Sequence, residues 1–162
     1  MSTLNPYEKF LDGRPVERIL ELTPNKIAIC LAEIGADKST VQPAPGKWSP
    51  AEVVAHLADC ELVFGFRLRQ TLAEDNPTVQ PFDQDKWAAT YSGISAGEAH
   101  RVFSSIREWN LRLLKSALPA AASRPVSHPE RGAMTFMTIA ETMAGHDLNH
   151  LVQLESIAAQ SA

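Results

Sequence analysis

Residues 48–74, WSPAEVVAHLADCELVFGFRLRQTLAE, combine the strongest helix-start signal in the chain with a long unbroken helical pattern. The Ser49 side chain is placed to accept a hydrogen bond from the backbone N–H of Glu52, and the Glu52 carboxylate can accept from the N–H of Ser49. Pro50 stands at the first helical position, where no N–H donor is needed. Apolar side chains then recur every three or four residues, the spacing of a helix that packs one face against a core. The stretch therefore predicts a helix from Pro50 to about Glu74.

Two helix starts are visible upstream of this stretch. Pro15 suits the first turn of a short helix over residues 15–21. Thr23-Pro24 has the pattern of an N-cap followed by proline at the first helical position, and the apolar period behind it stops at Gly35. These residues predict two helices, although they also fit a single helix broken at Pro24.

Two further helices are predicted downstream. Ser95 and Glu98 form a second capping box, and the pattern behind them ends near Leu118-Pro119. Thr135 is placed to cap a last helix that runs to about Ala159. The intervening segments hold prolines and glycines without a sustained period, and they are predicted as loops: 36–48, 75–94 and 119–134. No alternating strand pattern is visible, so the chain is predicted to be all-α with four main helices.

The composition is that of an ordinary globular domain. The chain has 162 residues, of which 44% are hydrophobic and 21% charged, and its formal net charge is −4. We expect one domain over residues 1–162. The negative balance argues against a nucleic-acid partner, and no apolar run approaches the about 20 residues that span a bilayer. No signal peptide is visible, and two cysteines are too few for a disulfide framework, so we expect a cytoplasmic protein.

The last predicted helix carries two histidines four residues apart, in the sequence HDLNH at 146–150. Residues at i and i+4 lie one turn apart on nearly the same side of a helix, so both imidazoles can reach one ion. Their stripe includes Ile139 and Met143 and should face the bundle interior. His56 lies on the apolar face of the 50–74 helix. Three inward histidines on facing helices match the way bundles build metal sites. The alternative is that all three are core polar groups with no ion.

Two enzyme classes with a similar histidine spacing do not fit. A zincin requires glutamate directly after the first histidine and a further ligand downstream. Here Asp147 stands in that place, and only twelve residues follow His150. Phosphohydrolases of the HD domain class require another aspartate well downstream, and no aspartate follows Asp147. A third ligand must therefore come from upstream, where His56 is the best candidate.

Five motifs together resemble the DinB-like (YfiT-like) superfamily of proposed metalloenzymes. They are WSPAEVVAHLAD at 48–59, LAEDNP at 72–77, PFDQDKW at 81–87, HPERG at 128–132 and HDLNHLVQ at 146–153. The resemblance implies a four-helix bundle with a long crossover connection. It implies a metal ion, usually nickel or zinc, on His56, His146 and His150. It also implies a homodimer, and reactions in which a low-molecular-weight thiol is transferred or assists an isomerisation.

These features predict a metal-dependent enzyme that acts on a small-molecule substrate. Three imidazoles leave at least one coordination position open, as in catalytic metal sites. An ion there lowers the pKa of water or of a thiol, so we expect hydrolase or thiol S-transferase chemistry. The alternative is a non-catalytic metal-binding protein of a stress-response or sensor type. Asp59, three residues after His56, and Gln153, three residues after His150, are candidates to orient a ligand or touch the substrate.

Other polar residues receive more local predictions. Asp147 points away from His146 around the helix, so it should bind a backbone or basic group rather than the ion. Cys60 is one turn after His56 and could approach the site, but a small buried thiol is its ordinary role. His128 either lines the mouth of the site or is an exposed loop residue. Arg67 and Arg69 are predicted to form ion pairs on the helix surface; the alternative, that they hold an anionic substrate, has no further support in the sequence.

Overall fold

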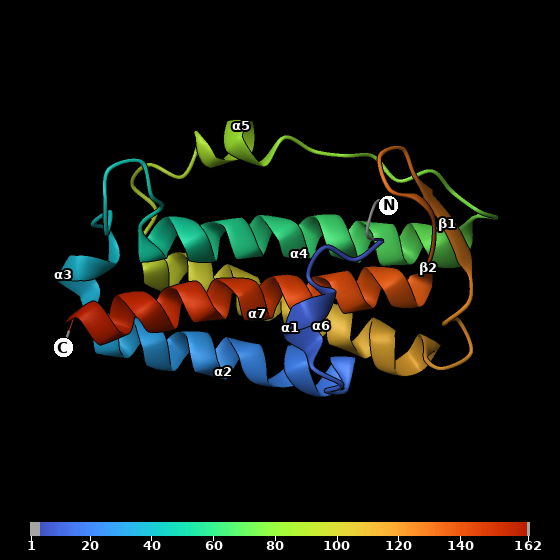
Figure 1. The fold of residues 1–162 in the computed structure, drawn as a ribbon, viewed down its shortest axis with the longest axis horizontal. Coiled ribbons are helices and arrows are strands. Elements are labelled where there is room, and N and C mark those ends of the chain that lie inside the picture. The colour runs from blue at the N-terminus through green and yellow to red at the C-terminus, as the bar shows by residue number, and fades with distance from the viewer. Residues whose placement is uncertain (1–3, 162) are drawn as a thin grey trace.

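The computed structural model describes residues 4–161, apart from the side chain of Ser161. Four long helices form a bundle: α2 (Val16–Ile34), α4 (Pro50–Ala73), α6 (Ala96–Ala117) and α7 (Phe136–Ser161). Helices α2 and α7 run in one direction along the bundle, and α4 and α6 run in the other (Figure 1). The predicted all-α four-helix bundle is confirmed. Three short helices also occur: α1 (Glu8–Leu11), α3 (Ala36–Ser39) and α5 (Gln84–Ala88).

A long crossover connects α4 to α6. Helices α2 and α4 each pack mainly against both α6 and α7. Because α4 and α6 are parallel, residues 74–95 must return along the length of the bundle, and they do so over its outer side (Figure 1). The short helix α5 interrupts this segment; Asp83 caps it by accepting a hydrogen bond from the N–H of Lys86 at 3.1 Å. This is the crossover that the family resemblance implied.

The predicted helix caps are present. Ser49 with Glu52, and Ser95 with Glu98, each form both hydrogen bonds of a capping box. Such a cap contributes on the order of 1 kcal/mol because it satisfies backbone donors that have no partner inside the helix. At α7, Thr135 Oγ1 accepts from the N–H of Thr138 at 3.2 Å. The starts of α4, α6 and α7 are therefore encoded locally.

Helix α2 continues through Pro24 instead of starting or breaking there. The structure has one helix, Val16–Ile34, with Pro24 inside it. Proline has no N–H, so the Leu20 carbonyl one turn earlier loses its helical partner. The guanidinium of Arg107 donates to that carbonyl at 3.0 Å. A donor from a neighbouring helix thus replaces the missing bond, and Thr23 is an interior residue of the helix rather than its cap.

The absence of strands was predicted wrongly for residues 119–134, which contain an antiparallel hairpin. Strand β1 (Pro125–His128) pairs with β2 (Gly132–Thr135). Strands of four residues are too short for an alternating pattern to be recognised in the sequence. The turn ends at Gly132, whose φ of 86° is a conformation that glycine adopts without a steric penalty. The hairpin lies at the end of the bundle where α7 begins (Figure 1).

The buried apolar side chains form two clusters along the bundle. One includes Cys60, Phe64 and Leu148, and the other includes Leu57 and Leu151. Both α4 and α7 pass from one cluster to the other, and the predicted metal ligands of these helices lie at that transition. No helix among residues 4–161 has the length and apolar character needed to cross a membrane.

Gly145 allows the N-terminal segment to lie against α7, so replacing it by alanine should destabilise the fold. A Cβ there would lie 2.7 Å from both Cβ and the backbone oxygen of Tyr7. We expect Gly145→Ala to lower the free energy of unfolding by about 1–3 kcal/mol, because the segment must shift. The matched control is Gly97→Ala in α6, where the nearest atom is the end of the Arg101 side chain at 3.9 Å. Urea denaturation should show Gly97→Ala unchanged or stabilised by up to about 1 kcal/mol; equal losses in both variants would contradict the expectation.

Candidate metal centre

Three histidines converge between α4 and α7. The Nε2 atoms of His56 and His146 are 3.0 Å apart. His150 completes the group, which we call the histidine trio: one ring nitrogen from each member lies within 4.8 Å of the others. All three side chains are buried. The structure therefore brings together the residues that the sequence suggested as ligands.

Burial keeps the histidine trio in the neutral form that binds metals. It lowers the pKa of His56 to about 3, with a further effect of the His150 charge. It also lowers the pKa of His146 well below its ordinary value. The pKa of His150 is lowered by burial as well, although the hydrogen bond to Gln153 opposes this effect. Three neutral imidazole nitrogens that face one another are a suitable donor set for a divalent transition metal.

Gln153 fixes the orientation of one member of the histidine trio. Its Oε1 atom lies 3.0 Å from Nδ1 of His150, one turn earlier on α7. An amide oxygen only accepts, so Nδ1 carries the proton and Nε2 is left with a free lone pair. In metal sites such outer hydrogen bonds set the tautomer of the ligand. By contrast, Nδ1 of His146 is buried without a hydrogen-bond partner among residues 4–161.

Asp59 binds a residue beside the site, Tyr91, rather than one of the histidines. Its Oδ2 atom accepts a hydrogen bond from the Tyr91 hydroxyl at 2.7 Å. Tyr91 packs edge-on against Trp48, and the Trp48 ring lies 4.9 Å from that of His56. The contact thus ties the end of the crossover segment to α4 beside the histidine trio. On the α7 side, the ring of Tyr7 packs edge-on against that of His146 at 5.2 Å.

Cys60 lies at the edge of the histidine trio. Its Sγ atom is 3.6 Å from Nε2 of His56 and 3.9 Å from Nε2 of His146. Burial, with a further effect of nearby carboxylates, raises the pKa of this thiol. Cys60 is therefore both a buried thiol and a neighbour of the site, which combines the two roles considered from the sequence.

A buried ion-pair network lies directly beneath the histidine trio. Arg107 of α6 donates to Glu61 of α4 at 2.5 Å and to Asp147 of α7 at 2.7 Å. This confirms that Asp147 binds a basic group. Burial acts to lower the pKa of Arg107, but the charges of Asp147 and Glu61 outweigh it and raise that pKa. With its bond to the Leu20 carbonyl of α2, Arg107 connects all four helices next to His146.

Near the site, the prediction for Arg67 and Arg69 was wrong, and one of the two alternatives for His128 is excluded. Arg67 and Arg69 form no ion pair among residues 4–161: Arg67 donates to the backbone oxygen of Gln80, and Arg69 donates to Asn110. His128 is not an exposed loop residue, because β1 carries it into the interior, where 5% of its surface is accessible. The sequence did not show that these side chains are covered, because the packing of the crossover and of the hairpin over them depends on residues far apart in the chain.

A family model described as the DinB superfamily matches residues 19–154, most of the chain. The chain belongs to the DinB superfamily. Two of its curated relatives carry the name "putative metal-dependent hydrolase". The one from Oceanobacillus iheyensis is 26% identical over 113 residues, covering 69% of this chain and 66% of the relative. The one from Bacillus mycoides is 24% identical over 139 residues, covering 85% of this chain and 80% of the relative.

A solved structure has a similar fold. YfiT from Bacillus subtilis superposes with a TM-score of 0.82 at 18% identity, over 90% of this chain and 85% of YfiT. It is described as a probable metal-dependent hydrolase with an unusual four-helix bundle topology. At this identity the likeness shows the fold. The histidine trio lies within the part of this DinB superfamily member that the family model matches.

The stability of the metal-free protein should fall as the pH decreases below about 6.5. The pKa of each member of the histidine trio is lowered in the native chain, so the unfolded chain binds protons that the native chain does not. Stability rises with pH wherever the unfolded state binds more protons, by up to about 1.4 kcal/mol per pH unit for each such histidine. Urea denaturation with a chelator at pH 7.5, 6.5 and 5.5 measures this. His56→Gln should give a shallower pH dependence, and an unchanged slope would contradict the expectation.

Proposed function

We propose that this protein is a metal-dependent hydrolase of a small molecule, with one divalent ion, zinc or nickel, on His56, His146 and His150. The observation that carries the proposal is the convergence of three buried, neutral imidazoles from two facing helices. The names of the curated relatives support hydrolysis rather than another reaction. A three-nitrogen donor set leaves an open position, which is typical of catalytic metal sites.

The bound ion would act as a Lewis acid that lowers the pKa of a water or thiol nucleophile and polarises the group under attack. The residues of the chain supply the setting for that chemistry. Gln153 holds the proton of His150 on Nδ1, so that Nε2 faces the site. Trp48 and Tyr7 cover the imidazoles on two sides and limit the access of bulk water, which strengthens electrostatic interactions inside the site.

The test is hydrolysis by protein loaded with one metal at a time. Metal-free protein is reconstituted with zinc or nickel and assayed against a panel of esters and amides, with and without a low-molecular-weight thiol. We expect hydrolysis in proportion to bound metal and independent of the thiol. Turnover only with the thiol would favour S-transferase chemistry instead. Stoichiometric metal without turnover of any substrate would favour the stress-response or sensor role. Hydrolysis that survives removal of the metal would contradict the proposal.

We also propose that the protein works in the cytoplasm as a homodimer. Three large apolar side chains, Leu62, Phe66 and Trp109, line a groove between α4 and α6, and each is more than half exposed. Burial of such side chains against a second copy would be favourable by about 25 cal/mol per Å² of apolar surface. Trp109→Asp is expected to shift the protein to monomer in sedimentation experiments. Val152→Asp, an equally exposed position on α7, should leave the association unchanged; a wild-type monomer at all concentrations would contradict the dimer.

A further inference from the structure

Arg67 is a buried cation without an anionic partner. Only 8% of its surface is accessible. Its Nη2 atom donates to the Gln80 backbone oxygen at 2.6 Å, and its Nε atom is buried with no hydrogen-bond partner. No carboxylate among residues 4–161 forms an ion pair with it. A buried charge is unfavourable unless it is paired, so this arrangement needs a compensating group.

A second buried arginine in the same bundle has its charge fully compensated by polar partners. Arg107, 1% exposed, contacts two carboxylates and a backbone carbonyl. Arg67 has only the carbonyl of Gln80. The guanidinium group offers five N–H donors in a fork that matches a carboxylate, and most of them remain available at Arg67. The contrast marks Arg67 as an incomplete anion site rather than a structural ion pair.

The other charges near Arg67 add to the positive potential. Burial lowers the pKa of Arg67, and the nearby charge of Arg131 lowers it further. The same two arginines contribute to lowering the pKa of His128, after burial. Asp83 is the one carboxylate on the wall of the adjacent groove, but it pairs with Lys86 at 3.1 Å and caps α5. The Glu130 charge acts in the opposite direction on the pKa of His128, but neither Glu130 nor any other carboxylate among residues 4–161 forms an ion pair with Arg67.

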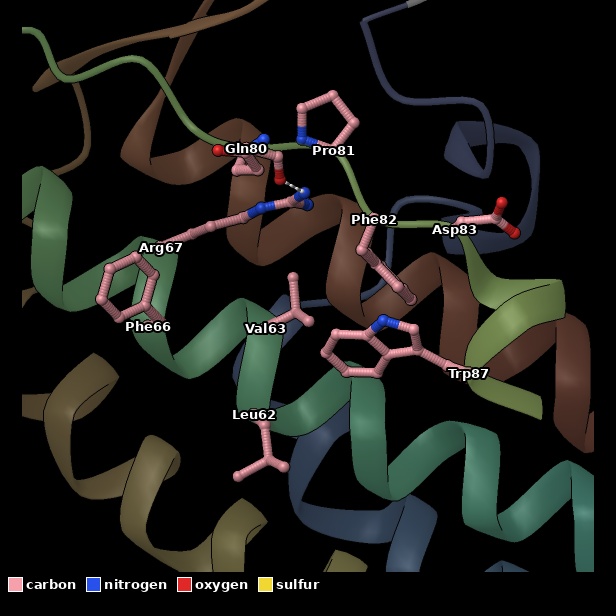
Figure 2. A pocket seen from close by; sticks show the side chains of 9 residues that line it. All are labelled: Leu62, Val63, Phe66, Arg67, Gln80, Pro81, Phe82, Asp83 and Trp87. Carbon is pink, nitrogen blue, oxygen red and sulfur yellow. Dashed lines mark hydrogen bonds between the residues drawn. The ribbon is translucent and has the colours of Figure 1, made fainter. Parts of the chain in front are cut away.

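Arg67 lies on a groove of suitable size and polarity for a small ligand. The groove separates α4 from residues 80–87 and has a volume of about 520 Å³, within the range of small-molecule pockets. Figure 2 shows the guanidinium at one end, beside Gln80, and the apolar side chains along the rest of the groove. The apolar lining is formed by Leu62, Val63, Phe66, Pro81, Phe82 and Trp87.

The groove continues the face of α4 that carries the metal centre. Arg67 is eleven residues after His56, which is three turns and about 16 Å along the helix axis on nearly the same side. Val63 lies between them on that face and also lines the groove. Arg67 is close enough to Cys60 for its charge to oppose the rise in the thiol pKa. An elongated molecule bound at Arg67 would point its other end along α4 toward the histidine trio.

We propose that the groove binds an amphipathic carboxylate, whose charged end pairs with Arg67 and whose apolar body packs against Phe82 and Trp87. The apolar lining and the buried Arg67, which has no ion pair among residues 4–161, together carry this assignment. The identification of this carboxylate with the substrate rests on the proposed function, because the carboxylate would then be the group by which the protein recognises its substrate. The binding itself requires no metal.

The test compares two probes of equal shape, 4-phenylbutyrate and its neutral amide 4-phenylbutyramide. Each is titrated calorimetrically into the full-length wild-type protein in the presence of a chelator. We expect the carboxylate to bind at least tenfold more tightly than the amide, because only the carboxylate compensates the guanidinium. Equal affinities, or no binding of either probe, would overturn the proposal.

Arg67→Gln should abolish the preference for the carboxylate, while Arg69→Gln, two residues further along α4, should retain it. Arg67→Lys should keep part of the preference, which separates loss of charge from loss of fold. Without a ligand, Arg67→Gln should melt at the same or a higher temperature than wild type, since it removes an unpaired buried charge. A preference that survives in Arg67→Gln would contradict the assignment.

Metal content is measured on the same preparations before the chelator is added. A carboxylate preference in a protein that binds no metal would refute the proposed function and leave the groove assignment standing. Stoichiometric metal with no preference between the probes would refute the assignment alone.

Discussion

Replacing His146 by alanine is expected to lower the affinity for Zn²⁺ by on the order of 100- to 1,000-fold. Structural zinc sites with four ligands bind with about 10–16 kcal/mol, so the loss of one ligand corresponds to about 3–4 kcal/mol. The ring centroid of His146 lies 4.5 Å from that of His150 and 5.0 Å from that of His56, and its Nε2 atom lies 3.0 Å from Nε2 of His56. Its removal leaves two nitrogens on different helices.

The measurement is competition against a chromophoric chelator, with metal content by mass spectrometry. The matched control is His100→Ala, because His100 interacts with the Pro24 carbonyl at 2.8 Å, away from the site. It should bind Zn²⁺ as wild type does. Gln153→Leu tests the outer hydrogen bond and should weaken binding about 10- to 100-fold. If His146→Ala and His100→Ala bind equally well, the histidine trio is not the metal site and its members are core polar groups.

Replacing Arg107 by methionine is expected to destabilise the protein by about 3–5 kcal/mol. Arg107 is buried between Glu61 and Asp147, and removing one partner of a buried ion pair leaves uncompensated charge in the interior. A domain is stable by only about 5–15 kcal/mol, so the variant should be partly unfolded at moderate temperature. The substitution should also affect the metal centre, because Asp147 directly follows the predicted ligand His146 in the HDLNH segment.

Thermal and urea denaturation of the metal-free protein measure this loss. Arg101→Met, at an exposed position on the same helix, should change stability by less than about 0.5 kcal/mol. The triple variant Arg107→Met, Glu61→Gln, Asp147→Asn should recover a large part of the loss, because no charge then remains at the three positions of this network. A triple variant as unstable as Arg107→Met alone would show that packing, not charge, is responsible.

Local sequence signals predicted α4, α6 and α7 and placed two of the three histidines on one side of a helix. Capping boxes depend on residues three apart, so the starts of α4 and α6 follow directly from Ser49 and Ser95. The i, i+4 spacing of His146 and His150 places both on one side of α7 in any packing. The apolar pattern of the 50–74 helix made His56 the candidate for the third ligand, and the family motifs implied the crossover. The continuation of α2 through Pro24 could not be predicted locally, because the donor that replaces the missing hydrogen bond, Arg107, belongs to α6.

What the tertiary structure alone decided are the contacts between residues far apart in the chain. The ion pairs of Arg107 join residues 40 and 46 positions away, and no local pattern distinguishes Arg107 from the exposed Arg101. The local sequence of α4 does not distinguish Arg67 from a surface arginine, and Arg67 is buried only because the crossover packs over it. Burial and pairing of a charge depend on which elements pack over it, and this depends on the balance of contacts across the whole bundle. The sequence by itself determined which side chains share a helix face, including the two histidines of α7; packing determined that His56 meets them and that Arg67 is left without an anion.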